Sequence, residues 1–118
     1  MYFVSTFICE LANKSTNEIQ FIPAFTGLGA PYWNSDVRGQ ITGITRDTSK
    51  ADIAMAALKS ICYQTRDLLE CLLNDTELKR NDFTIRVDGG MSKNNLMMQL
   101  LSDICLLYTS DAADDVVG

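Results

Sequence analysis

The spacing of apolar and polar residues changes several times along the chain, and each change predicts a different element. Residues 19–25 form a short apolar run rich in β-branched and aromatic side chains, which predicts a strand that ends by Pro23. Residues 40–45 alternate between polar and apolar side chains and predict a second strand. Residues 83–87 predict a third strand, which ends at Asp88 and the two glycines that follow it.

The strongest periodic pattern lies between residues 50 and 74 and predicts a long helix. Ser49 is a favourable N-cap, and Asp52 three residues later completes a start that resembles a capping box. Apolar residues recur at steps of three or four, so we expect one buried stripe along the helix. The members of this stripe are Ile53, Ala57, Ile61, Thr65, Leu68 and Leu72.

Two further segments complete the predicted order of elements. Residues 26–36 hold two glycines and a proline beside Tyr32 and Trp33, which predicts a turn-rich loop whose aromatic side chains hold it against a core. The order strand, loop, strand, long helix, strand, glycine pair, helix is an α/β pattern. The period of the last helix is carried by Leu96, Met97, Leu100, Leu101 and Ile104.

Charge and composition exclude several classes of partner. The chain has 118 residues, 47% of them hydrophobic, which fits one globular domain. Its net charge is -5 and it holds no basic run, so we expect neither nucleic acid nor an anionic membrane as a partner. No apolar stretch approaches the roughly 20 residues that a spanning helix needs. We therefore expect a soluble, acidic, globular chain.

Histidine is absent, and this excludes several chemistries. A Ser-His-Asp triad, a Cys-His pair and a histidine metal site cannot form within the chain. The cysteines show no C-x-x-C spacing, and we expect them to pack as small apolar side chains in a reducing compartment. They are Cys9, Cys62, Cys71 and Cys105.

One segment combines a strand, a glycine pair and the start of a helix. Gly89 and Gly90 allow a sharp turn and a close approach of a ligand to the backbone. A helix N-terminus presents free N–H groups there, and Asn94 adds an amide that can pair with a nucleobase. The segment suits the nucleoside end of a nucleotide, beside the alternative of a glycine pair that only reverses the chain. For Asp88, a role as base or metal ligand stands beside an ordinary turn hydrogen bond.

Five short motifs, taken together, indicate a protein family. Residues 21–33 read FIPAFTGLGAPYW, residues 38–39 read RG, residues 43–46 read GITR, residues 63–66 read YQTR, and residues 87–90 read VDGG. This set resembles the C-terminal domain of the FGGY carbohydrate kinases. Within that family, residues 26–33 are similar to the glycerol kinases rather than the xylulose or gluconate kinases. The resemblance covers residues 11–105.

The resemblance implies a fold and a reaction. The fold would be α/β, a partial actin-like, ribonuclease H-like ATPase domain. The full-length enzyme would use ATP with Mg²⁺ to phosphorylate glycerol to glycerol 3-phosphate in the cytoplasm, leaving ADP. The resemblance places Gly89, Gly90 and Asn94 at the adenine nucleotide. In the family the polyol pocket, the catalytic aspartate and the first phosphate-binding turn precede this region. We therefore expect no catalytic residue and no metal ligand in this chain, which alone should be inactive.

Three alternatives remain beside this interpretation. The chain would also fit a fragment of another FGGY polyol or sugar kinase, or a non-catalytic binding or scaffold remnant. An actin- or Hsp70-like ATPase would explain the glycine pair but not residues 26–33. Lys59 replaces an acidic or amide residue of the family pattern, on a helix surface where a homo-oligomer of the full-length protein could form a contact.

The two ends of the chain are expected to differ from its middle. Residues 11–105 are the predicted partial domain, and residues 1–10 are expected to be the truncated remnant of a helix. Residues 106–118 carry three aspartates and no basic residue, and they resemble a translated sequencing adapter. We expect this tail to be an assembly artefact, foreign to the family, and not to pack on the domain.

Overall fold

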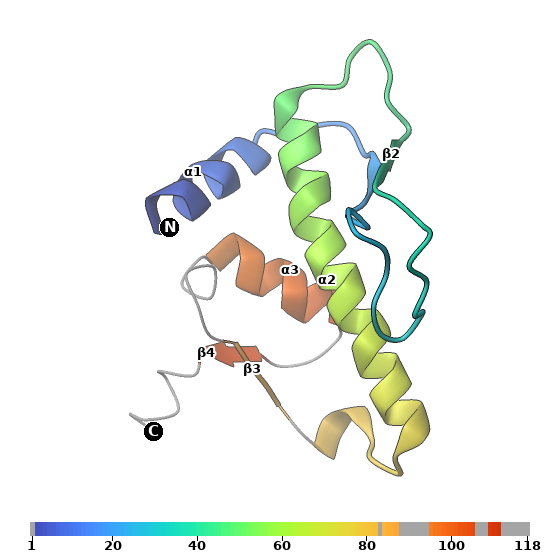
Figure 1. Ribbon diagram of the computed structural model, residues 1–118. Helices are drawn as coiled ribbons and strands as arrows, with labels where there is room; N and C mark the ends of the chain where they lie inside the picture. Colours follow the sequence, from blue (N-terminus) through green and yellow to red (C-terminus); the bar gives the residue numbers. More distant parts are fainter. Residues whose placement is uncertain (1, 83, 88–94, 106–108, 112–118) are drawn as a thin grey trace.

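The computed structural model describes residues 2–82, 84–87, 95–105 and 109–111, and this part of the chain contains both helices and strands (Figure 1). The elements are α1 (Tyr2–Ala12), β1 (Gln20–Ile22), β2 (Gln40–Thr42), α2 (Lys50–Asp75), the 3-10 helix η1 (Arg80–Asp82), β3 (Ile85–Val87), α3 (Asn95–Cys105) and β4 (Thr109–Asp111). The predicted α/β order is confirmed, and the helix expected within residues 1–10 is present as α1. The elements η1 and β4 are added to the predicted order.

α2 is the central element, and its start is the one that the sequence predicts. The Ser49 side chain accepts a hydrogen bond from the Asp52 N–H at 3.3 Å, and the Ser49 N–H donates to the Asp52 carboxylate at 2.9 Å. This reciprocal pair satisfies two N–H groups that a helix start leaves without partners. The capping box is confirmed, and α2 ends one residue beyond the predicted bound.

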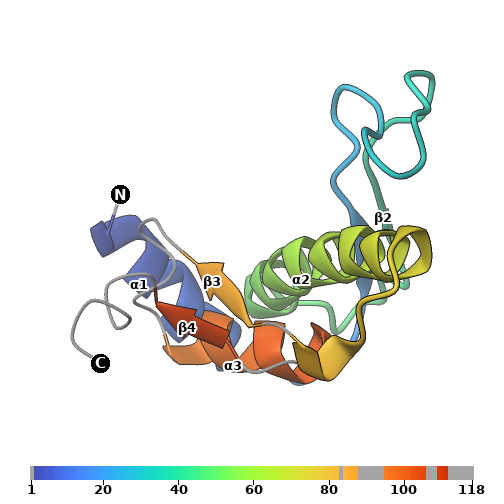
Figure 2. The same ribbon diagram turned by 90° about the horizontal axis from the view of Figure 1, so that it is seen from below.

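The core lies between α2, α1 and α3. α1 and α3 pack on one side of α2, while β1 and the loop that follows it lie on another side (Figures 1 and 2). Many of the buried side chains are small, which lets the helices approach closely. The buried cluster consists of Cys9, Ala12, Leu58, Cys62, Leu69, Met97, Leu101 and Cys105.

The predicted buried stripe of α2 is wrong. Ile61 and Leu72 are 47% and 49% exposed, and Ile53 and Leu68 are exposed too, while Ala57 and Thr65 are half-buried. Apolar residues lie on more than one side of this helix, so the period alone does not select the packed side. Contacts with α1, α3 and β1 select it instead. The residues that they bury are Ala51, Asp52, Ala56, Leu58, Ser60, Cys62 and Leu69.

The described strands form two small sheets. β1 pairs with β2 in antiparallel fashion, with Phe21 opposite Ile41. β3 pairs with β4 in parallel, with Arg86 opposite Ser110. The predicted strands are present but shorter, and Phe83 lies outside the described residues.

Three residues of the C-terminal segment pair with another strand of the chain. Thr109–Asp111 form β4 beside β3, so the prediction that residues 106–118 do not pack is wrong for these three positions. Strand pairing uses main-chain N–H and C=O groups, and polar side chains do not prevent it. Residues 106–108 and 112–118 lie outside the described residues.

The loop between β1 and β2 is closed by its own backbone and does not hold its aromatic side chains against a core. Leu28 and Asn34 exchange main-chain hydrogen bonds of 2.7 and 3.0 Å. Tyr32 and Trp33 are 56% and 78% exposed, so the prediction that they anchor the loop in the core is wrong. Gly27 has a φ of 100°, and a side chain there would meet Ser35.

The structure confirms the predicted packing of three cysteines. Cys9, Cys62 and Cys105 are buried in the core, and Cys71 is half-buried; all four are free thiols. The described helices include none that combines the length and apolar character needed to cross a membrane.

Candidate functional site

The predicted nucleotide turn lies between β3 and α3. β3 ends at Val87 and α3 begins at Asn95. Gly89, Gly90 and Asn94 fall in the connection, outside the described residues. Because β3 and β4 run parallel with α3 between them in sequence, the three elements form a βαβ unit. Ligands of open α/β sheets bind beyond the carboxyl ends of such strands, which is where this connection begins.

One face of α3 fixes the helix against the core. Met97, Leu101 and Cys105 are buried and recur at four-residue steps, so they lie on the same side of the helix. Together with Leu58 and Cys62 of α2 they belong to the buried cluster. The packing of this face determines where the helix lies relative to α2.

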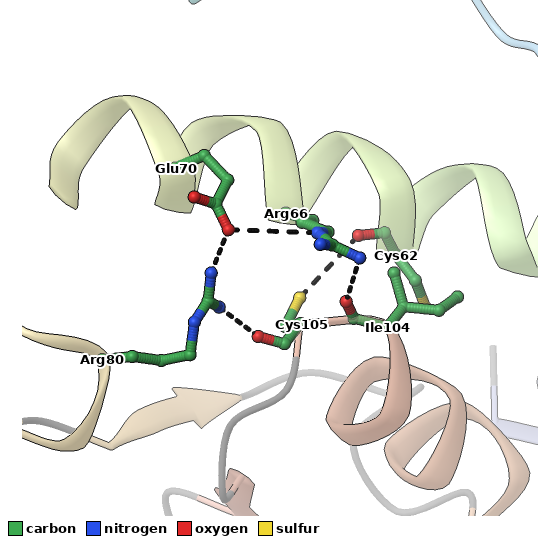
Figure 3. A network of polar contacts seen from close by, with 6 residues as sticks. All are labelled: Cys62, Arg66, Glu70, Arg80, Ile104 and Cys105. Atoms are coloured by element: carbon green, nitrogen blue, oxygen red, sulfur yellow. Dashed lines mark hydrogen bonds and ion pairs between the residues drawn. The ribbon is translucent and has the colours of Figure 1, made fainter. Parts of the chain in front are cut away.

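The last turn of α3 is held by a polar junction (Figure 3). Arg66 of α2 donates to the Ile104 carbonyl at 3.1 Å, and Arg80 of η1 donates to the Cys105 carbonyl. Glu70 forms an ion pair with Arg80, and its carboxylate lies 3.9 Å from Arg66 Nε. The last carbonyls of a helix have no partner within it and carry a negative partial charge, so guanidinium donors stabilise them.

A thiol contact lies beside this junction. Cys105 Sγ donates to the Cys62 carbonyl at 3.8 Å (Figure 3). Burial and the neighbouring Cys105 raise the pKa of Cys62 to about 11, and burial also raises the pKa of Cys105. Both groups are therefore protonated near neutral pH, and neither is suited to act as a nucleophile or a metal ligand.

A second junction joins the start of α2 to the segment after α1, and Asp52 is its centre. Asp52 Oδ1 accepts hydrogen bonds from the Ser15 hydroxyl at 2.8 Å and from the N–H groups of Thr16 and Asn17 at 3.1 and 3.0 Å. Hydrogen bonds from the Ser49 N–H, from Asn17 and from Ser15 hold the pKa of this carboxyl well below its usual range. Asp52 is thus a buried, ionised carboxylate with a structural role.

A groove lies between α2 on one side and β1 with the loop of residues 26–36 on the other. It has a volume of 350 Å³ and is lined on its α2 side by Ser60, Tyr63, Gln64 and Asp67. The Tyr32 hydroxyl donates a hydrogen bond of 2.7 Å to Asp67 across it, which raises the pKa of Tyr32. This contact ties an otherwise exposed loop to the helix.

The described residues do not offer a metal site. Among them, no three side chains of the His, Cys, Asp and Glu types gather as ion ligands. Asp52 uses its carboxylate oxygens in hydrogen bonds, and Glu70 pairs with arginines. Magnesium prefers several carboxylate oxygens, so the described part of the chain does not fit this ion.

The sequence interpretation did not identify the junction at the end of α3. Arg66 and Glu70 are four residues apart on α2, a spacing that favours an ion pair. This part of the junction could therefore have been predicted from the sequence. Arg80 lies beyond the end of α2 and meets Glu70 only through the turn of the chain at residues 76–79, which no local pattern predicts.

The comparisons with known proteins agree with the fold. The model of the FGGY family of carbohydrate kinases, C-terminal domain, matches residues 8–109. A glycerol kinase of Rhizobium meliloti (strain 1021) is 52% identical over 97 residues, which are 82% of this chain and 19% of that protein. A glycerol kinase of Ligilactobacillus salivarius is 52% identical over 95 residues, 79% of this chain and 18% of the relative. The chain thus spans about a fifth of the length of these curated relatives.

Solved structures give the same result. The Plasmodium falciparum glycerol kinase with ADP superposes with a TM-score of 0.83 at 34% identity, over 90% of this chain and 21% of that one. A gluconate kinase from Lactobacillus acidophilus gives 0.73 at 25% identity, over 86% of this chain and 21% of the other. The predicted actin-like α/β fold class is confirmed. This chain belongs to the FGGY family of carbohydrate kinases and carries part of the family's C-terminal domain.

Proposed function

We propose that the full-length protein that contains this chain transfers the γ-phosphoryl group of ATP to glycerol, giving glycerol 3-phosphate and ADP. The observation that carries the proposal is the 52% identity over 97 residues with a glycerol kinase. The structural likeness to a gluconate kinase is weaker, at 25% identity against 34% for the Plasmodium enzyme. That difference favours glycerol over a sugar acid as the acceptor.

We assign one wall of the nucleotide site to the turn between β3 and α3. Gly89 and Gly90 give the nucleotide room to approach the backbone, and Asn94 pairs with the base. The position of the turn, after a parallel strand and before a helix, supports this assignment. The structural likeness to the Plasmodium falciparum glycerol kinase with ADP supports it too.

The chemical step needs groups that we do not assign to this chain. Phosphoryl transfer relies on a phosphate cradle, a metal ion and a residue that orients the attacking hydroxyl. Magnesium, when bound with ATP, neutralises charge on the phosphates. The described residues do not fit that ion. We therefore assign to this chain the binding and orientation of the nucleoside, and we assign no catalytic residue to it. A cytoplasmic location and a homo-oligomeric full-length protein belong to the same proposal.

A substitution at Gly90 tests the assignment. The host is a full-length glycerol kinase that carries residues 8–109 of this chain in place of its matched region. We expect Gly90→Ala to raise the KM for ATP about tenfold or more, which is about 1.4 kcal/mol. The KM for glycerol should stay near its original value. The matched control is Gly29→Ala, because a side chain at Gly29 meets open space. A rise in the KM for glycerol alone, or lower stability with both constants unchanged, would overturn the assignment.

A further inference from the structure

Four large apolar side chains of α2 lie on a side of the helix that the described elements leave open. They recur at helical spacing between residues 53 and 72, and each is between 39% and 49% exposed. From about 100° of rotation and 1.5 Å of rise per residue, they fall within an arc of about 100° and extend over about 28 Å. We call this surface the outer stripe; it consists of Ile53, Ile61, Leu68 and Leu72.

The outer stripe carries no charge along its length. Within the same arc the one polar side chain is that of Gln64. The charged residues between positions 53 and 72 lie on other sides of the helix, because their positions fall outside this arc. They are Lys59, Arg66, Asp67 and Glu70. A helix surface that faces water normally carries charged and polar residues, so the outer stripe has the composition of a packing surface.

The buried side of α2 holds fewer large apolar residues than the outer stripe. It has two leucines, Leu58 and Leu69, and its other buried side chains are small or polar. The gain from burial follows the apolar area removed from water, so an isoleucine or leucine contributes more than an alanine or serine. α2 therefore has apolar surfaces on two sides, and α1, α3 and β1 cover one part of them. Such a pattern is typical of a helix that is buried within a larger fold.

The relatives show how much protein is available to cover the outer stripe. The chain spans 19% of the Rhizobium meliloti glycerol kinase and 21% of the Plasmodium falciparum enzyme that it matches. A long, contiguous exposed apolar surface is unusual on a folded monomer. We propose that the outer stripe packs against an apolar surface of the same full-length protein, formed by residues outside this chain. The packing would be the same whichever substrate that protein uses.

A cysteine placed in the outer stripe measures whether the stripe is covered. Leu68→Cys is made in the 118-residue chain and in the full-length glycerol kinase host that carries residues 8–109, and mass spectrometry follows alkylation at this site. We expect the site to react at least about tenfold more slowly in the host than in the isolated chain, because a covered thiol is shielded from the reagent. The matched control is Glu77→Cys, since Glu77 is exposed and lies just beyond α2. It should react quickly in both proteins.

A second pair of variants tests the apolar character of the contact. Leu68→Gln keeps a good helix former of similar size but adds a polar amide, whereas Leu68→Met stays apolar. In the host we expect Leu68→Gln to lower the melting temperature by about 2 to 4 °C, and Leu68→Met to lower it less. In the isolated chain Leu68→Gln should leave the melting temperature nearly unchanged, because half of this side chain already meets water.

Three results would overturn the proposal. Equally fast alkylation of Leu68→Cys in the host and in the isolated chain would mean that the outer stripe stays open in the full-length protein. Slow alkylation in both would place the stripe in the core of the chain itself. Protection in the host that is lost on dilution, with a change in mass by light scattering, would assign the stripe to a contact between copies. If Leu68→Cys does not fold, Ile61→Cys takes its place. None of these measurements uses enzymatic activity, so their failure is separate from a failure of the proposed function.

Discussion

The hydroxyl of Ser15 donates a 2.8 Å hydrogen bond to the carboxylate of Asp52, across 37 positions of sequence. The same carboxylate accepts from the Ser49 N–H at the start of α2. One side chain therefore caps a helix and also holds the segment that leads from α1 to β1. Asp52 is 1% exposed, so these contacts lie away from water.

Replacement of Asp52 tests this junction. We expect Asp52→Asn to lower the melting temperature of the chain by several degrees at pH 7, because an amide cannot accept all of these N–H groups. The pKa of Asp52 is lower in the folded chain than in the unfolded one. Its contribution to stability is therefore complete well above the unfolded pKa, near 4, and is lost as the pH falls toward the folded pKa.

The melting temperature measured by circular dichroism between pH 7 and pH 2 provides the readout. Below about pH 4 the curve of Asp52→Asn should fall less steeply than that of the parent chain. Asp47→Asn is the control, because Asp47 is exposed and offers only its main-chain carbonyl to Asn17. Parallel curves for Asp52→Asn and the parent would show that the carboxylate does not carry this stability.

The cysteines should differ in their reaction with a thiol reagent. With a pKa of about 11, only about one Cys62 thiol in a thousand is ionised at pH 8, and burial also shields it. Cys71 is half-buried and should react first, while Cys9 and Cys105 react slowly because they are buried and their pKa values are raised.

Mass spectrometry after alkylation at pH 8 measures these rates site by site. Cys71→Ser should remove the fast phase and leave the slow phase unchanged. In denaturant all four sites should react alike. Equal rates at Cys71 and Cys62 in the folded chain would mean that the core described around α3 is not formed.

The start of α2 could be predicted from sequence, whereas its packed side could not. The capping box of Ser49 and Asp52 is a local pattern, and the structure reproduces it. The stripe through Ile61 and Leu72 is equally regular, yet these residues are largely exposed. Small residues such as Ala56 and Ser60 are buried instead, because neighbouring segments approach closely there. Which side is approached depends on contacts between segments distant in sequence.

Contacts between segments distant in sequence also limit what can be predicted about the site. The glycine pair after β3 is visible as a pattern, but the junction of Glu70 with Arg80 requires that two elements meet in space. For the aromatic residues of the loop, the sequence predicted a contact with the core that the structure does not contain. Tyr32 contacts Asp67 through its hydroxyl, and its ring is largely exposed. Aromatic character alone does not establish burial.

The pairing of β3 with β4 leads to a prediction about the C-terminal segment. A chain that ends at Asp111 keeps the pairing, and we propose that residues beyond it are foreign to the family and not needed by the fold. A chain that ends at Cys105 loses the partner of β3 and exposes its main-chain groups. The first truncation should leave the melting temperature unchanged, and the second should lower it. Equal melting temperatures for the two truncations would contradict the role of β4.

In the proposed function this chain binds the nucleoside within a full-length glycerol kinase, and the catalytic groups are assigned to other parts of that protein. Positioning and electrostatic stabilisation supply most of the catalysis in phosphoryl transfer, and both need groups that we do not assign to this chain. The 118-residue chain alone should therefore release no ADP in response to glycerol. The full-length host that carries residues 8–109 should do so.

A coupled ADP-release assay with ATP and glycerol measures both proteins side by side. We expect glycerol-dependent turnover by the host, within about tenfold of the unmodified enzyme (about 1.4 kcal/mol), and none by the isolated chain above a mock preparation. Glycerol-dependent turnover by the isolated chain, or a folded host that releases no ADP, would show that the proposed division of roles is wrong.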